Sequence, residues 1–284
     1  MKRPPAALLL AALVAAPVAV GIVYAVGGAV GAWGVGARSA GAGLDPGRLL
    51  RVVSEPVVVE GTLWTLRVAL VSTALSTAVA VALALAFRGT DRTSRVGRTL
   101  ALLPLPVPHL VAAVAALLIL GQSGLLARLA FAAGWIDGPA AMPALVYDRP
   151  GIGVIVALVW KEVPFLTLVA GSVLATRGDA LERTARRLGA SRWEVLRRVT
   201  WPTLWRGMLP AIVAVFAFVV GSWEVAALLA PSDPLALPLV TLERYTDTDL
   251  ARRPDAFVLT LVGVAIAGCA VLLHEWADRR AGRA

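Results

Sequence analysis

Between two apolar segments, residues 181–202 read LERTARRLGASRWEVLRRVTWP. Leu181, Thr184, Ala185 and Leu188 recur at i, i+3, i+4 and i+7, and this spacing predicts one face of a helix. Gly189 follows and supplies the permissive backbone with which helices commonly end. We therefore predict a first short helix that stops at Gly189.

A second helix is expected directly after this glycine. Ser191 and Glu194 have the spacing of a capping box, in which each side chain bonds the other residue's backbone N–H. The residue before a proline disfavours helical geometry, so Pro202 is expected to close the helix. Its apolar stripe is formed by Trp193, Leu196 and Val199. The prediction is helix, tight turn, helix, with three small residues at the corner, Gly189, Ala190 and Ser191.

The rest of the chain is that of an all-α integral membrane protein. Its 284 residues are 58% hydrophobic and 16% charged, whereas soluble domains carry about 25% charge. A membrane-spanning helix needs roughly 20 apolar residues. Six segments qualify as transmembrane helices: residues 5–31, 61–87, 100–120, 151–175, 210–230 and 256–275. The first exceeds the roughly 7–15 apolar residues of a signal peptide, so we expect an uncleaved anchor.

The basic residues orient these spans. Of the 27 Lys and Arg, 17 lie at the two ends and in connections 88–99 and 176–209, and 8 lie in the other three connections. Cytoplasmic loops carry the excess of Lys and Arg. We predict that both termini and the loop 176–209 are cytoplasmic. The net charge of +9 is then explained by topology and lipid headgroups, and not by nucleic acid.

Several chemistries are excluded. The two lysines, Lys2 and Lys161, do not follow a glycine, so no phosphate-binding G-x-x-x-x-G-K-[ST] loop is present. The two histidines, His109 and His274, fall on different predicted spans, and Cys269 is the only cysteine. No His/Cys metal cluster or intrachain disulfide is expected. We expect no enzyme activity, no metal and no cofactor in this chain.

Three interpretations of residues 181–202 compete. The segment could lie on anionic headgroups as a basic amphipathic element, or it could read DNA, which a loop tied to the membrane at both ends disfavours. A docking element for a cytosolic protein explains the small-residue corner, because small residues let another chain approach closely.

The segment resembles the EAA loop of the permease subunits of binding-protein-dependent ABC importers, which have the MetI-like fold. The matching residues are Ala185, Gly189, Ala190, Ser191, Leu196, Val199 and Pro202. Arg183 and Thr184 depart from the Glu and first Ala of the motif, and Glu182 stands one position early. The resemblance covers residues 61–275. It implies a first helix and external connector (1–60), a permease domain (61–275) with coupling loop 176–209, and a cytoplasmic tail (276–284).

The resemblance implies a role for the loop and a set of partners. The loop would dock on cytoplasmic ATP-binding-cassette ATPase subunits, which use the ATP. The other expected partners are a second permease chain (identical or different), an extracytoplasmic solute-binding protein and membrane lipids, in a multi-pass bacterial inner-membrane complex. The residues expected to couple the ATPase are Glu182, Ala185, Gly189, Ala190, Ser191, Trp193, Leu196 and Pro202.

Charged residues inside the spans are candidates for the solute path. A charge at bilayer depth costs about 2.5–3.5 kcal/mol on insertion scales, so it should face protein or water. The candidate path residues are Lys161, Glu162, Trp223 and Glu224. Alternatively, a Lys161–Glu224 pair or an inter-subunit pair only locks helices together. Arg67 is expected to reach outward or pair externally, and His109 to be a polar group at a helix start.

The solute is less defined. Residues 221–231 and 237–250 are similar to permeases of the polyamine, sulfate, thiamine and ferric-iron importers. Two other functions are weighed against an importer: a non-catalytic membrane anchor or assembly factor, and a secondary transporter or channel that works without ATP. Inverted repeats would favour the latter, and none is evident in the sequence.

Overall fold

The protein is helical throughout the part of the chain that is described. The computed structural model describes residues 5–32, 45 and 47–281, and these contain no β-strand. Six helices are long and apolar enough to cross a membrane. The predicted all-α class and the six spans are confirmed, whereas the orientation of the termini stays a prediction.

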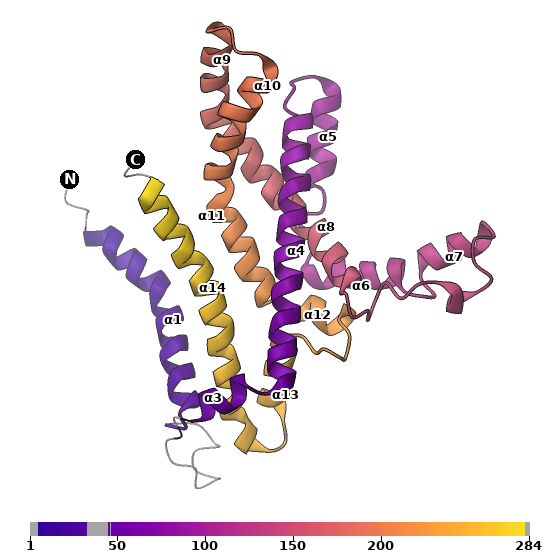
Figure 1. The fold of residues 1–284 in the computed structure, drawn as a ribbon, viewed down its shortest axis with the longest axis vertical. Helices are drawn as coiled ribbons and strands as arrows, with labels where there is room; N and C mark the ends of the chain where they lie inside the picture. The colour runs from indigo at the N-terminus through magenta and orange to yellow at the C-terminus, as the bar shows by residue number, and fades with distance from the viewer. Residues whose placement is uncertain (1–4, 33–44, 46, 282–284) are drawn as a thin grey trace. The chain divides into compact units, whose positions relative to one another are not determined.

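Figure 1 shows the helices, which group into two compact units. The candidate spans are Ala12–Ala29, Pro56–Ala86, His109–Ala132, Ile152–Thr176, Arg192–Val220 and Leu250–Arg280. Four of these spans cover most of the corresponding predicted segment. The third and the fifth differ, and prolines and glycines explain why.

The third span begins at His109 and not at residue 100. Helix α5 (Arg92–Leu102), capped by the Asp91 carboxylate that accepts from the Ser94 N–H at 3.0 Å, ends before the proline-rich stretch 104–108. Helix α6 (His109–Leu120) starts directly after Pro108. Each proline lacks an N–H and disfavours helical geometry in the residue before it. Three prolines in five residues therefore separate two helices instead of opening one.

The fifth span ends earlier than predicted. Helix α11 (Trp201–Val220) stops at Gly221, and Ser222 has extended backbone angles. A short separate helix, α12 (Trp223–Leu229), follows. The predicted span 210–230 therefore combines the second half of one helix with a second helix.

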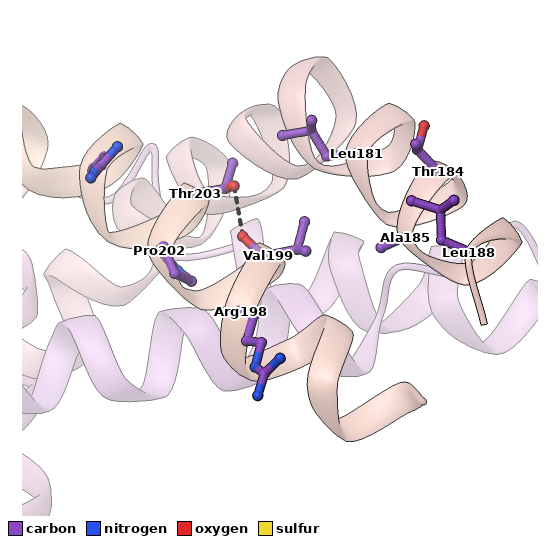
Figure 2. A pocket seen from close by; sticks show the side chains of 9 residues that line it. Leu181, Thr184, Ala185, Leu188, Arg198, Val199, Pro202 and Thr203 are labelled. Atoms are coloured by element: carbon purple, nitrogen blue, oxygen red, sulfur yellow. Dashed lines mark hydrogen bonds between the residues drawn. The ribbon is translucent and has the colours of Figure 1, made fainter. Parts of the chain in front are cut away.

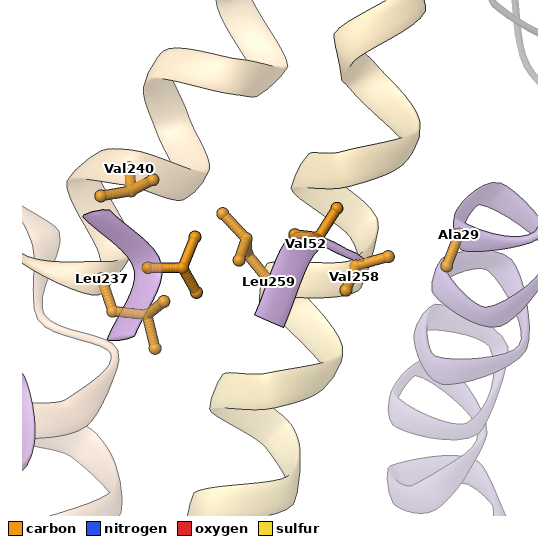
Figure 3. Packing of buried hydrophobic residues seen from close by; sticks show 7 residues of the cluster. Ala29, Val52, Leu237, Val240, Val258 and Leu259 are labelled. Atoms are coloured by element: carbon orange, nitrogen blue, oxygen red, sulfur yellow. The ribbon is translucent and has the colours of Figure 1, made fainter. Parts of the chain in front are cut away.

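The first unit comprises residues 1–64 and 234–266. It contains α1 (Pro5–Ala29), α3 (Arg48–Val53), α13 (Leu237–Thr246), the 3-10 turn η4 (Leu250–Arg252), and the first residues of α4 (Pro56–Ala86) and α14 (Arg253–Ala281). Its apolar core is formed by Ala29, Val52, Val58, Leu237, Val240, Val258 and Leu259 (Figure 3). A Cβ at Gly28 would lie 2.4 Å from the Phe257 ring, so glycine permits this close packing.

An ionic cluster joins the elements of this unit. Arg244 pairs with Glu55, and its Nη1 lies 3.8 Å from Asp255. Arg48 Nε lies 3.6 Å from the other oxygen of Asp255. Helix α3 lies in the predicted external connector, of which residues 33–44 and 46 lie outside the described residues.

The second unit comprises residues 65–233 and 267–284 and is centred on α8 (Ile152–Val173). This helix contacts α5, α6, α11 and α12, and its Leu158 and Leu166 are fully buried. A Cβ at Gly207 of α11 would come within 2.6 Å of Val173, which shows how closely α11 packs on α8. Outside this packing lie helix α7 (Leu125–Ala132) and the 3-10 turn η1 (Pro139–Ala141).

Candidate functional site

The basic segment, residues 179–206, lies at one end of the second unit, where Figure 1 places α9 and α10. Helix α9 (Asp179–Arg187) follows a π-helical turn, η2 (Leu174–Gly178). Gly189 has φ +87°, and its N–H donates to the Arg186 carbonyl at 3.0 Å. The Ala190 N–H donates to the Ala185 carbonyl at 3.1 Å. These two bonds form a Schellman motif, so the predicted end of the first helix at Gly189 is confirmed.

The predicted capping box is also present at the start of α10 (Arg192–Val195). The Ser191 hydroxyl accepts from the Glu194 N–H at 3.3 Å, and the Glu194 carboxylate accepts from the Ser191 N–H at 3.0 Å. The C-terminal motif of α9 ends at Ala190, and the N-cap residue Ser191 follows directly. The turn therefore has its backbone groups satisfied on both sides by local residues alone.

The prediction that Pro202 closes the second helix is wrong. The chain passes from α10 through a π-helical turn, η3 (Leu196–Thr200), into α11 without a break. The Trp201 N–H donates to the Leu196 carbonyl, one residue further back than in an α-helix. Proline has no N–H and its ring collides with the carbonyl four residues earlier. The widened turn just before Pro202 accommodates this ring, and the helix continues.

Glu182 turns inward and holds the segment to the rest of the unit. Its side chain is 6% exposed and accepts from Arg88 Nη1 at 2.9 and 3.1 Å. The Thr200 hydroxyl donates to the same carboxylate at 2.6 Å, and Arg186 Nη2 lies 3.6 Å away. We call Arg88, Glu182 and Thr200 the inner clamp. It joins the end of α4, helix α9 and the turn η3.

An open groove of about 420 Å³ runs between α9 and the start of α11. Figure 2 shows its two sides, with Leu181, Thr184 and Ala185 on α9 and Leu188 directly after it, facing the helix that carries Val199, Pro202 and Thr203. Arg198 and Arg206 also line it. The inner clamp fixes the spacing of α9 and η3, because Glu182 lies on α9 and Thr200 on η3.

The residues expected to couple the ATPase fall into three groups by exposure. Trp193 is 67% exposed and the neighbouring Leu188 is 83% exposed, and Gly189 and Ser191 are exposed as well. The partly covered residues are Ala185, Ala190, Leu196 and Pro202. Glu182 is buried, so it supports the segment from inside. The coupling role of these residues stays a prediction.

The candidate solute-path charges are buried in the middle of α8. Lys161 and Glu162 are each 7% exposed. The Lys161 ammonium donates to the Leu105 carbonyl at 3.1 Å, in the proline-rich break before α6. His109 Nε2 lies 3.0 Å from a Glu162 oxygen, and the His109 ring packs on Phe218 at 4.7 Å. His109 is the first residue of α6, so the predicted position at a helix start is confirmed. Its pairing with Glu162 was not predicted from the sequence.

The other two candidates, Trp223 and Glu224, make no described hydrogen bond or ion pair with this cluster. Trp223, at the start of α12, is 49% exposed and Glu224 is partly buried. Among the described ion pairs none joins Lys161 to Glu224, so that alternative is not realised within the chain. Arg67 Nη2 donates to the Arg149 carbonyl at 2.7 Å. Arg67 thus takes the pairing alternative predicted for it.

Sequence reasoning missed Arg88, Thr200 and the partnership of His109 with Glu162. Arg88 is 94 residues from Glu182 in the chain, and His109 is 53 residues from Glu162. No local spacing rule connects groups this far apart. The available signal was only that Glu182 is an isolated acid among arginines, which requires a nearby cation once it is buried.

Six apolar helices, with an ordered two-helix segment between the fourth and the fifth and no phosphate-binding loop, have the architecture of a permease that another protein drives. Residues 66–283 match the family model described as "Binding-protein-dependent transport system inner membrane component". The chain therefore belongs to this family, and it is the permease subunit of an ABC importer.

Relatives agree with this assignment. A probable molybdenum ABC transporter permease of Haloferax volcanii is 30% identical over 81% of this chain and 80% of its own length. The molybdenum transport system permease ModB of Mycobacterium tuberculosis is 30% identical over 81% of this chain and 83% of its own length. A solved bacterial alginate ABC transporter chain shares the fold, with a TM-score of 0.69 at 18% identity over 96% of this chain and 93% of that one.

Family membership settles several expectations. The chain is a multi-pass inner-membrane protein and is not itself an enzyme. Importers of this class work with an ATPase and a solute-binding protein. The alternatives of a membrane anchor and of an ATP-independent transporter are not favoured.

Proposed function

We propose that the basic segment is the element through which a separate ATPase drives this permease. The observation that carries the proposal is the turn 188–193. It is fixed by a Schellman motif and a capping box, and yet it exposes Leu188 and Trp193. Large apolar side chains on a rigid, exposed turn are typical anchors of protein interfaces. The inner clamp then gives movement of the turn a direct connection to α4 and α11.

The wider assembly follows from this role. The turn and both termini would face the cytoplasm, in agreement with the distribution of Lys and Arg. Two permease chains, identical or different, would enclose the solute path. A solute-binding protein would dock on the opposite side of the membrane.

The experiment is Gly189→Val in the complete transporter reconstituted with its ATPase and solute-binding protein. Gly189 has φ +87°, and no atom lies within 4 Å of a Cβ built there. The substitution therefore acts through the backbone, at a cost of about 1–2 kcal/mol or more in this conformation. We expect solute-stimulated ATP hydrolysis to fall to the unstimulated rate.

A matched control is Gly268→Val on α14, where the added side chain also meets nothing within 4 Å but the backbone is helical. This variant should keep normal stimulation. Both proteins should insert into the membrane in equal amounts. Normal stimulation in the Gly189 variant would disprove the coupling role.

For the solute we propose a small tetrahedral oxyanion of the molybdate and sulfate class. The support is the similarity to molybdenum permeases at 30% identity and to sulfate permeases at lower identity, such as CysW of Escherichia coli at 27%. Both solutes are compact dianions, so one path would serve either. This narrows the group of solutes expected from the sequence to its sulfate-like member.

The test is uptake of isotope-labelled molybdate and sulfate into proteoliposomes that contain the complete transporter. ATP-dependent uptake of either oxyanion supports the proposal. Uptake of a polyamine or thiamine, with no uptake of either oxyanion, would refute it.

For the path itself we propose Lys161, Glu162, Trp223 and Glu224. The support is the burial of two opposite charges side by side in α8, which is costly unless the charges serve a function or are paired. His109 partners Glu162 at 3.0 Å, and among the described residues the hydrogen-bond partner of Lys161 is the Leu105 carbonyl oxygen. No described carboxylate lies within ion-pair distance of Lys161, which supports a role for this side chain in binding an anion.

A further inference from the structure

The exposed surface of the basic segment carries mostly positive charge. Between residues 180 and 206 there are seven arginines, all with exposed side chains, Arg183, Arg186, Arg187, Arg192, Arg197, Arg198 and Arg206. The same stretch has two carboxylates. Glu182 is buried in the inner clamp, and Glu194 is held by the Ser191 hydroxyl at 2.8 Å and by its N–H. A partner that approaches the turn 188–193 meets guanidinium groups, the Glu194 carboxylate and two large apolar side chains, Leu188 and Trp193.

Arg183 and Arg187 are the best placed of these cations. They lie four residues apart on α9, and therefore on one face of the helix. Neither has a hydrogen bond or an ion pair with any residue that the structure describes, whereas Arg186 lies 3.6 Å from Glu182. Arg187 is next to the exposed Leu188. A surface that covers Leu188 would thus desolvate Arg187.

We propose that the ATPase docks on this segment with an acidic surface, whose carboxylates pair with Arg183 and Arg187 around an apolar centre formed by Leu188 and Trp193. The inference rests on the proposed coupling role and adds the chemistry of the partner. Guanidinium groups match carboxylates bidentately, and a desolvated arginine without a counter-charge is strongly unfavourable. Charge complementarity at an interface rim also selects the right partner.

Anionic lipid headgroups are the competing occupant for a basic surface. The geometry of the turn favours a protein. Gly189, Ala190 and Ser191 leave the corner without bulky side chains, and the backbone there is fixed on both sides. A rigid corner of small residues suits close contact with a shaped surface, whereas soft headgroups need only charge and an apolar face.

The test uses carbodiimide, which joins a primary amine to a carboxylate that lies in contact with it. The chain has only two lysines, Lys2 and the buried Lys161, so its own reactivity is low. The variants are Arg183→Lys and Arg187→Lys in the complete transporter in native membranes. We expect cross-linking to the ATPase, with the joined residue identified by mass spectrometry as Asp or Glu. The matched control is Arg95→Lys, an exposed arginine on α5, which should give no ATPase product.

A second variant separates the two proposals. Arg183→Cys, labelled with a short linker that reacts with the thiol at one end and is photoactivated at the other, captures whatever protein lies near position 183 irrespective of charge. Capture of the ATPase by this route but not by carbodiimide would overturn the acidic surface and leave the coupling role intact. Capture of the ATPase by neither route would overturn both. Lipid products alone from the lysine variants would assign the surface to headgroups and also refute the proposal.

A salt series gives an independent measure. Charge pairs at the rim of an interface weaken as ionic strength rises. At low salt the ATPase should bind the Arg183→Glu, Arg187→Glu variant about tenfold more weakly than the Arg92→Glu, Arg95→Glu variant on α5, and its affinity for the first variant should fall less as salt is raised. Equal losses for the two pairs would show a general effect of net charge and contradict the proposal.

Discussion

The turn of the basic segment and the charged cluster of α8 are built in opposite ways. At the turn, every stabilising bond joins residues within five positions of one another, and the functional candidates point outward. In the cluster, Glu162 and Lys161 contact groups more than 50 residues away and point inward. The comparison suggests that the turn keeps its shape when it moves, whereas the cluster depends on how α6, α8 and α11 are packed.

The inner clamp holds the basic segment to the end of α4, and its loss is expected to have the largest effect. Glu182→Ala leaves Arg88 and Thr200 without their acceptor, and breaking a buried ion pair costs about 3–5 kcal/mol. Because the Arg88 side chain is 27% exposed, we expect the low end of this range. The thermal unfolding midpoint of the purified permease in detergent should fall by roughly 5–10 °C.

A double variant sharpens this prediction. Glu182→Ala with Arg88→Met removes both charges and should regain much of the lost stability, since uncharged replacements of buried pairs are often neutral. Glu243→Gln, at an exposed position of α13, should leave the midpoint unchanged. A double variant that is no more stable than Glu182→Ala alone would show that the clamp is not an ion pair in energetic terms.

The next largest effect is expected in the cluster. Lys161→Met should reduce oxyanion uptake by about tenfold or more, because a buried cation that faces the path contributes at least 1.4 kcal/mol to passage of an anion. Lys161→Arg keeps the charge and should retain more uptake. The measurement is initial uptake in proteoliposomes with equal amounts of permease and ATPase. Full uptake after Lys161→Met would favour the purely structural interpretation.

Glu224→Gln is expected to have a smaller effect on uptake than Lys161→Met, and it tests one residue of the proposed path. This residue is partly buried on α12, apart from the described ion pairs. We expect uptake to change severalfold while the ATPase still co-purifies with the permease. Unchanged uptake would remove Glu224 from the proposed path.

The smallest effect is expected from the cap. Ser191→Ala removes the hydroxyl that caps α10, at a cost of about 1 kcal/mol. Solute-stimulated ATP hydrolysis should fall by at most about fivefold. Ser172→Ala, on an exposed face of α8, is the matched control. A complete loss of stimulation after Ser191→Ala would mean that the hydroxyl contacts the ATPase directly.

The same contrast explains what the sequence could predict. Gly189, Ser191 and Glu194 are governed by local rules, and their turn was predicted residue by residue. The predicted spans ran through the helix breaks at 103–108 and at Gly221, because the apolar composition continues through both. Only the backbone effects of proline and glycine interrupt the helix there. Pro202 failed as a stop because a π-helical turn absorbed its ring.

Partners distant in the chain were beyond prediction for a different reason. Arg88 and Glu182, or His109 and Glu162, meet only because the helices pack in a particular arrangement. Their charges marked them as residues in need of partners, and the sequence has no rule that selects one partner among many arginines.

The central claim is that the turn 188–193 holds the ATPase while Glu182 faces inward. A cryo-electron microscopy structure of the permease with its ATPase tests it most directly. We predict that Leu188 and Trp193 are covered by the ATPase, with Asp or Glu side chains next to Arg183 and Arg187, and that Glu182 keeps its bonds to Arg88 and Thr200. A structure in which the turn faces lipid or solvent, with the ATPase bound elsewhere, would contradict the account.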